Sequence, residues 1–308
     1  MDARVADLSE LLSDAALAQV RAHPQFPIAA EHMARGAVDQ FRQLEEPFRS
    51  ILKDVGTGSI ALLALAQQHS PDGLTAASLL SACVSRDLAS RGRVRAFLDL
   101  CFRYGQILTL DRAEPWTRRK LSLHPGLITA YRERFMVELG AISILYPELE
   151  ARQADLQDEQ TFLDIMMWIG VFSQIRPDVL LNHASNPPME MFVHRAGGML
   201  MLFDLMLGQA PGRARLLEVA PISRYGLAKR YGVSRIHVAR TLADAEAQGL
   251  MSFPSANTVV FTPKLSDALE AQTALLFQWI RASVIASQRT RANAAAPGMG
   301  AAPVVKTA

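Results

Sequence analysis

The sequence predicts a mainly α-helical protein in which two compact units, each made of helices and a small β-hairpin, are joined by a helical connector. Half of the 308 residues are apolar, so the chain can bury a large core. Apolar residues recur at three- and four-residue spacing through most of the chain, which is typical of amphipathic helices. In two places, near 105–123 and 250–262, a pair of helical patterns is followed by two short strand-like runs around a turn.

The chain begins with two predicted helices. Residues 5–22 carry leucines on one apolar stripe, and Pro24 and Pro27 end this helix. Residues 28–52 form the second helix, and the glycines at 56 and 58 are expected in a turn between helices. A turn is strongly favoured there over a phosphate loop because no Gly-Lys-Ser/Thr follows.

The first unit has predicted helices at 60–68, 76–84 and 90–104, and a hairpin that pairs 105–110 with 119–123. Arginines at the start of a helix oppose its dipole unless an anion is bound, which favours phosphate or guanine contact over a merely solvated helix start. The candidate DNA-binding residues of this unit are Ser90, Arg91, Arg93, Arg95, Arg118, Arg119 and Lys120.

The connector contains predicted helices at 124–146, 161–174 and 189–207. Seven of the twelve methionines lie between Met166 and Met206. Because the methionine side chain is flexible and polarizable, these helices fit three readings: a packed core, a self-association surface or an effector pocket.

The stretch 221–262 says most about function. Ser223 caps a short helix that ends before Gly232, where a left-handed turn is available. Ser234 caps the next helix, whose buried face is Val238, Leu242 and Ala245. Arg235, Ile236, His237 and Arg240 lie off that face, in the first two turns, where a recognition helix presents side chains to the major groove of DNA.

Helix, turn, helix and hairpin is the order of a winged helix. The Gly-Val-Ser corner at 232–234, the Ser-Arg-x-x-Val-x-Arg-x-Leu run at 234–242 and Gly-Leu at 249–250 resemble the winged helix-turn-helix domains of MarR-like and GntR-like bacterial transcription regulators. The resemblance implies double-stranded DNA binding through Ser234, Arg235, Ile236, His237 and Arg240. The hairpin tip at 255–258 lacks the Arg or Lys that usually grips a minor groove.

Charge is distributed unevenly although the net charge is only +2. Residues 86–120 carry nine basic and four acidic groups, and residues 213–240 carry seven and one. Residues 133–190 carry three basic and ten acidic groups. Two basic islands beside an acidic middle favour two surfaces that face phosphate.

Other chemistry is not indicated. The two cysteines have no metal-ligand or Cys-x-x-Cys spacing, and no catalytic constellation or nucleotide loop is present, so no enzyme activity, cofactor or metal is expected. No apolar run is long enough to span a bilayer and no signal sequence is seen, so a cytoplasmic protein without a membrane partner is expected.

The predicted domains are the N-terminal helices at 1–55, the first winged-helix module at 56–124, the helical connector at 125–192, the second winged-helix module at 193–265, a C-terminal helix at 266–288 and a disordered tail at 289–308. The predicted function is sequence-specific DNA binding by a homodimeric transcription regulator, with recognition helices near 90–104 and 234–248 and an unidentified small-molecule effector. Two alternatives remain open: a replication-initiator-like DNA binder, and a winged-helix scaffold that binds protein.

Overall fold

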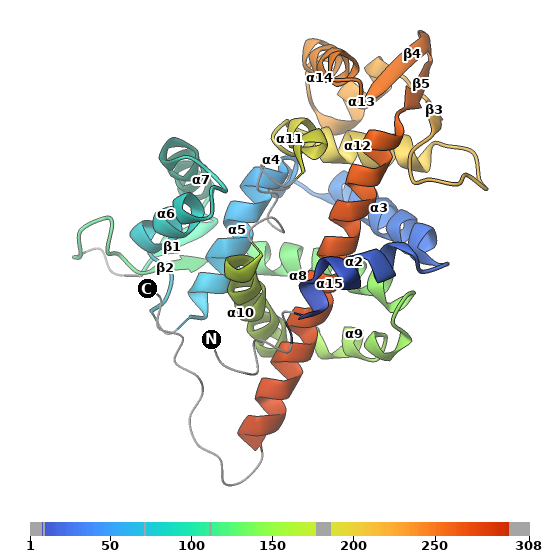
Figure 1. Cartoon of the computed structure of the whole chain (residues 1–308). Coiled ribbons are helices and arrows are strands. Elements are labelled where there is room, and N and C mark those ends of the chain that lie inside the picture. Colours follow the sequence, from blue (N-terminus) through green and yellow to red (C-terminus); the bar gives the residue numbers. More distant parts are fainter. Residues whose placement is uncertain (1–7, 9, 71, 111–112, 177–185, 296–308) are drawn as a thin grey trace.

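The computed structural model describes residues 8, 10–70, 72–110, 113–176 and 186–295. The chain is mainly helical, as predicted, and contains two small antiparallel sheets. The sheets lie in two separate units that are joined through a body of helices (Figure 1). None of the helices in the described ranges combines the length and the apolar character that crossing a membrane requires.

The N-terminal region is more broken than predicted. It contains η1 (Glu10–Leu12), α2 (Asp14–Arg21), α3 (Phe26–Gln43) and α4 (Phe48–Leu52). The single helix predicted over 5–22 is wrong because Ser13 starts a new helix, its hydroxyl accepting a bond from the Ala16 amide at 3.3 Å. The single helix predicted over 28–52 is also wrong, since the chain leaves the helix before Pro47, which lacks the amide hydrogen needed to continue it.

The first unit consists of α5 (Val55–Gln68), α6 (Ala76–Ser85), α7 (Arg91–Arg103), β1 (Ile107–Thr109) and β2 (Leu121–Leu123). The strands pair antiparallel, with Ile107 opposite Leu123, and an additional bridge joins Thr75 to Lys120. Thr75 caps α6 in a reciprocal capping box with Ser78. The predicted helices 76–84 and 90–104 and their hairpin are therefore confirmed.

The turn predicted at Gly56 to Gly58 is wrong, because both glycines lie in the first turns of α5. Asp54 caps this helix by accepting a bond from the Thr57 amide at 3.3 Å. Gly56 is needed for packing rather than for a turn: a Cβ there would lie 2.7 Å from Nη2 of Arg93. The small residue lets the arginine of α7 pass directly over α5.

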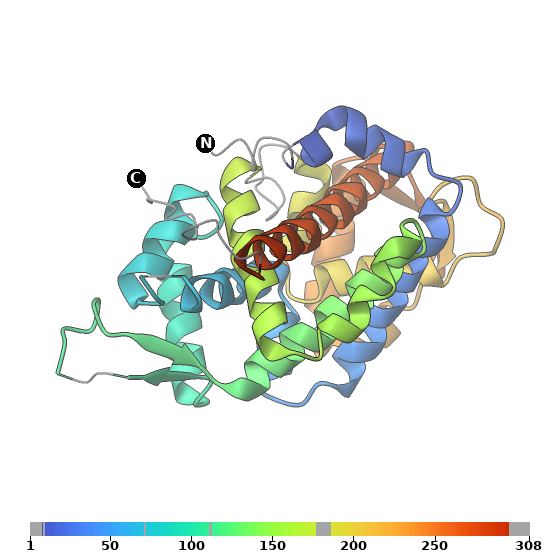
Figure 2. The ribbon, with the colours of Figure 1, turned by 90° about the horizontal axis from the view of Figure 1, so that it is seen from below.

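The central body holds α8 (Pro125–Ser143), η2 (Pro147–Leu149), α9 (Arg152–Asp155), α10 (Glu159–Ile175), α11 (Pro187–Val193) and α15 (Pro263–Ala295). The 33-residue α15 packs along α10 and α2, and α3 packs along α8 (Figure 2). This helix is longer than the predicted 266–288, so residues 289–295 are helical and not part of a disordered tail. The rest of the predicted tail, 296–308, lies outside the described residues.

The second unit consists of α12 (Gly198–Leu207), β3 (Val219–Pro221), α13 (Arg224–Tyr231), α14 (Arg235–Ala247), β4 (Met251–Ser255) and β5 (Thr258–Phe261). Its sheet is antiparallel with the order β3-β5-β4. The hairpin was predicted, but β3 was not. The helix predicted over 189–207 is broken at Gly197, which adopts φ +73°.

Most methionines of the methionine-rich helices are buried in the core, as the first of the three interpretations predicted. Buried methionines here are Met166, Met189, Met191, Met199, Met201 and Met206. Because these methionine side chains are enclosed, they do not form part of the exposed surface.

Candidate nucleic-acid interface

The corner between α13 and α14 is built by three local signals. The Ser223 hydroxyl accepts a bond from the Gly226 amide at 3.0 Å and starts α13. Gly232 ends that helix with φ +60° and ψ +38°, a left-handed conformation that favours glycine. The Ser234 hydroxyl then accepts a bond from the His237 amide at 3.0 Å and starts α14. These local features determine where α13 begins and ends and where α14 begins.

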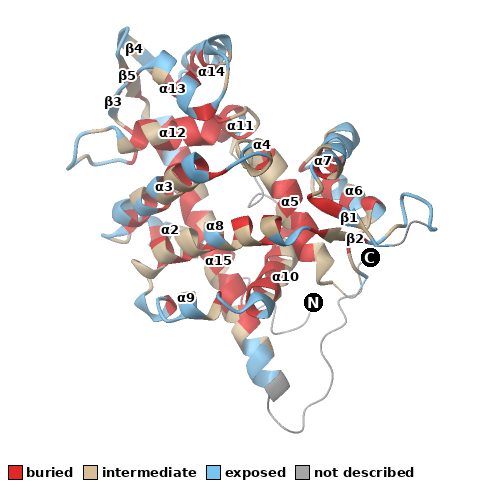
Figure 3. Cartoon of the chain, turned by 180° about the vertical axis from the view of Figure 1, so that it is seen from behind, coloured by how far each residue is buried: buried red, intermediate tan, exposed pale blue. Residues whose placement is uncertain are grey.

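The N-terminal half of α14 presents an open face. Ser234, Arg235 and Arg240 are exposed, and Ile236 is 64% exposed (Figure 3). Within the part of the chain that the structure describes, no carboxylate forms an ion pair with Arg235 or Arg240. An uncompensated positive charge at a helix N-terminus favours an anionic partner.

Tyr225 and Arg224 on α13 extend this face, and neither was predicted. The Arg235 guanidinium lies 4.5 Å from the centre of the Tyr225 ring, which is itself 56% exposed. Arg224 lies 5.1 Å over the Phe253 ring of β4. Stacking on an aromatic ring restricts each arginine without using its hydrogen-bond donors, so the donors stay available. The sequence could have indicated Arg224 and Tyr225, because both directly follow the Ser223 cap.

His237 does not project outward with Arg235 and Arg240, contrary to the prediction. Its side chain is half-buried, and Nε2 lies 3.0 Å from the carbonyl oxygen of Ala196. Arg195 forms an ion pair with Asp244 further along α14. The inner edge of α14 is therefore held against the 195–196 segment, and His237 serves this attachment.

The three arginines predicted at the start of α7 have different surroundings. Arg91 and Arg95 are exposed. The Arg93 side chain is only 28% exposed, and its Nη2 lies 2.6 Å from each carboxylate oxygen of Asp54. A second nitrogen of Arg93 lies 3.2 Å from Nδ1 of His194. Ser90, as predicted, caps the helix through the Arg93 amide.

The hairpin loop of the first unit carries exposed Arg118 and Lys120. Arg119 is half-buried, because its Nε donates a 2.7 Å bond to the Glu114 carbonyl oxygen. Trp116 stacks on Phe102 of α7 with ring centres 4.9 Å apart, which ties the loop to the helix. Of the three basic residues predicted to contact DNA from this loop, Arg118 and Lys120 therefore face solvent and Arg119 does not.

The tip of the second hairpin is polar and uncharged. The Ser255 hydroxyl donates a 3.0 Å bond to the Thr258 hydroxyl across the turn. This bond joins the two sides of the turn, and the basic groups closest to the open face of α14 lie on α13 and α14 and not at the hairpin tip.

The cysteines are buried and separate from this face. Burial raises the pKa of Cys83 and of Cys101 to about 12, so both thiols are protonated at neutral pH. Among the described residues, no group of three or more His, Cys, Asp or Glu side chains is arranged to hold a metal ion.

Comparison of the chain with protein-family models, with curated proteins and with solved structures gave no match.

Proposed function

We propose that the protein is a transcription regulator that binds specific double-stranded DNA sequences, with α14 in one major groove and α7 in a second. The observation that carries this function is the open N-terminal face of α14, with Arg235 and Arg240 free of carboxylate partners in the described chain. Such a face matches the place where recognition helices contact base edges.

The arrangement of the second unit supports a winged-helix assignment. A helix, a short strand, two further helices and a hairpin follow one another, and the strand β3 joins the sheet beside β5. The first unit repeats this plan, with the Thr75 bridge in the place of β3. These features agree with the resemblance to MarR-like and GntR-like regulators.

The first unit contributes Arg91, Arg95, Arg118 and Lys120 to DNA in this proposal. Arg93 is excluded because it is committed to Asp54. Phosphate contacts of this kind strengthen binding to every sequence and make it depend on salt. A homodimer would place four units on DNA, and sedimentation velocity measures whether it forms.

The decisive experiment selects bound duplexes from a random DNA pool and then measures their affinity by fluorescence anisotropy. For the selected duplex, Arg235→Ala is expected to weaken binding by about 1 to 3 kcal/mol and to relax preference at one base pair. Arg152→Ala removes the same charge from α9 and is the matched control, since Arg152 pairs with Asp155 in the acidic middle. Equal losses in both variants, or no enrichment of any duplex, would refute DNA reading by α14.

The arrangement of the selected sites also separates the regulator from a replication initiator. Inverted repeats favour a dimeric regulator, whereas iterated direct repeats favour an initiator-like protein.

Three exposed apolar side chains on the hairpin of the first unit favour a second function, protein binding. Leu108 is 50% exposed, Leu110 is 68% exposed and Trp116 is 41% exposed. Exposed apolar groups clustered on one hairpin are typical of a contact surface. If no duplex is selected, retention of a partner that is lost on Leu110→Ser would support this function.

A further inference from the structure

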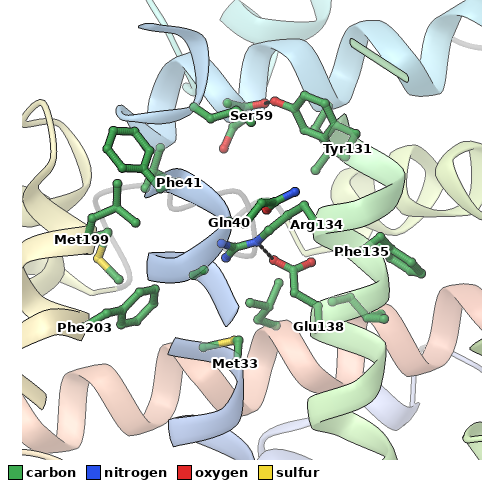
Figure 4. A pocket seen from close by; sticks show the side chains of 18 of the residues that line it. Met33, Gln40, Phe41, Ser59, Tyr131, Arg134, Phe135, Glu138, Met199 and Phe203 are labelled. Carbon is green, nitrogen blue, oxygen red and sulfur yellow. Dashed lines mark hydrogen bonds and ion pairs between the residues drawn. The ribbon is translucent and has the colours of Figure 1, made fainter. Parts of the chain in front are cut away.

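A cavity of about 210 Å³ lies in the helical body between the two units. Its walls come from α3, α4, α5, α8, α10, α12 and α15, so residues far apart in the sequence meet around one space (Figure 4). None of the residues proposed to contact DNA lines it. This space is therefore a separate feature of the molecule.

Most of the lining is apolar and adaptable. Large aromatic and methionine side chains surround the space, among them Met33, Phe41, Phe135, Met199, Phe203 and Trp279. Methionine changes shape at low cost, and aromatic rings offer flat apolar surface. Apolar surface of this kind would accept a hydrocarbon or aromatic body and exclude water from it.

Polar groups enter the cavity from α8 and α3. Arg134 Nε donates a 2.6 Å bond to Glu138 Oε1, and their side chains are 25% and 13% exposed. Figure 4 shows the Arg134 guanidinium beside Gln40 in the middle of the lining. Gln40 donates from Nε2 to the Ala130 carbonyl oxygen at 3.1 Å, which fixes its amide.

The two terminal nitrogens of the Arg134 guanidinium are available as hydrogen-bond donors. Its bond to Glu138 uses Nε, and within the described residues neither terminal nitrogen has a hydrogen-bond partner. A guanidinium binds a carboxylate through two such donors. The charge of Glu138 opposes a second anion, so the pair limits the affinity for an acid without abolishing it.

We propose that this cavity binds a small amphipathic acid, with an aromatic or aliphatic body among the apolar residues and a carboxylate on Arg134. A cavity of about 150 Å³ holds benzene in another protein, so this one, at about 210 Å³, suits a molecule of about eight or nine non-hydrogen atoms. The larger size and the charged pair distinguish it from a dry packing defect.

A molecule bound in the cavity would contact helices of both units. Gly58 and Ser59 of α5 line the cavity, as do Met199 and Phe203 of α12. Lys53, also in the lining, accepts a 2.7 Å bond from the Gly197 amide through its carbonyl oxygen. Any effect of the acid on DNA affinity rests on the proposed function, whereas binding of the acid does not.

The test is isothermal titration calorimetry of the full chain without DNA, using benzoate and its neutral analogue benzyl alcohol. One site is expected for each compound. Arg134→Gln should raise the Kd of the acid about tenfold or more and change that of the alcohol by less than about twofold, because a charged hydrogen bond is lost only for the acid. Arg132→Gln, on the same helix and outside the lining, is the matched control and should change neither.

Glu138→Gln provides a test of opposite sign. Removing this carboxylate should lower the Kd of the acid, since the competing negative charge is gone. If Arg134→Gln does not fold, the Kd of Glu138→Gln tests the acid site in its place. The amphipathic-acid site is overturned if the acid does not bind, if Arg132→Gln weakens it as much as Arg134→Gln, or if Glu138→Gln weakens it.

A DNA titration with and without saturating benzoate follows only after binding is established. A change in DNA affinity that Arg134→Gln removes would identify the acid site as regulatory. Acid binding with no retained duplex would refute the DNA proposal and leave the ligand site standing, so the two failures are distinguishable.

Discussion

The ion pair between Arg93 and Asp54 allows stability and DNA contact to be separated in one helix. Arg93→Ala removes both 2.6 Å contacts to the carboxylate, whose side chain is 20% exposed. Fully exposed pairs contribute about 0.2 to 1 kcal/mol, and loss of one partner of a buried pair costs about 3 to 5 kcal/mol. For this half-buried pair we expect a decrease of about 1 to 2 kcal/mol in the free energy of unfolding, measured by urea denaturation.

Asp54 needs a variant that isolates its charge, because it also caps α5. Asn is as good a cap as Asp, so Asp54→Asn keeps the cap and removes the ion pair, whereas Asp54→Ala loses about 1 kcal/mol more. In a double-mutant cycle, Arg93→Ala and Asp54→Asn should be non-additive by about 1 kcal/mol. Additive losses would mean that the two residues do not stabilise each other.

Arg95→Ala is the partner variant for DNA. Arg95 is exposed on the same helix, so its loss should leave the unfolding free energy within about 0.5 kcal/mol and reduce the salt slope of DNA binding by about 1. Arg93→Ala should leave that slope unchanged. If Arg93→Ala left the stability unchanged and reduced the salt slope, Arg93 would contact DNA and would not stabilise the fold through Asp54.

Three further outcomes are expected. Thiol-specific dye should label neither Cys83 nor Cys101 in the native protein at pH 8 and should label both in guanidinium, because burial raises each pKa to about 12; rapid native labelling would contradict this burial. Gly232→Ala should cost about 1 kcal/mol of unfolding free energy and Gly232→Asn less, since Asn tolerates φ +60° and no atom lies within 4 Å; equal losses would contradict it. Burial lowers the pKa of His69 below 6.5, so just below pH 6.5 the unfolded chain binds more protons than the folded chain. The free energy of unfolding should therefore fall as the pH drops below 6.5. In urea titrations, His69→Gln should reduce this fall.

The second unit was largely predictable because its signals are local. Ser223 and Ser234 each start a helix by accepting a bond from the amide three residues later, and the amide of Gly232 donates to the Ala228 carbonyl oxygen where α13 ends. Residues with such short-range effects can be read without knowledge of the fold. The strand at 219–221 was missed because it is three residues long and is defined only by its pairing with 258–260.

The errors concern residues whose roles depend on distant parts of the chain. Gly56 resembles a turn residue, but it is small because Arg93 packs over it. His237 lies on the outer side of the predicted helix, yet it turns toward Ala196, 41 residues earlier. Neither partner is visible from spacing along the sequence, so the sequence alone could not separate the side chains that face solvent from those that hold the helices in place.

The length of α15 has a consequence for how the two units would occupy a duplex. The helix begins at Pro263, two residues after β5 ends, and its 33 residues extend for about 50 Å along α2 and α10. The second unit therefore continues directly into a rod that is packed into the body, without a long pliable tether. A stiff connection of this kind fixes how one unit is rotated relative to the other. If both units bind DNA, adding half a helical turn between two target sequences would place these on opposite sides of the duplex, where the units could not reach both at once.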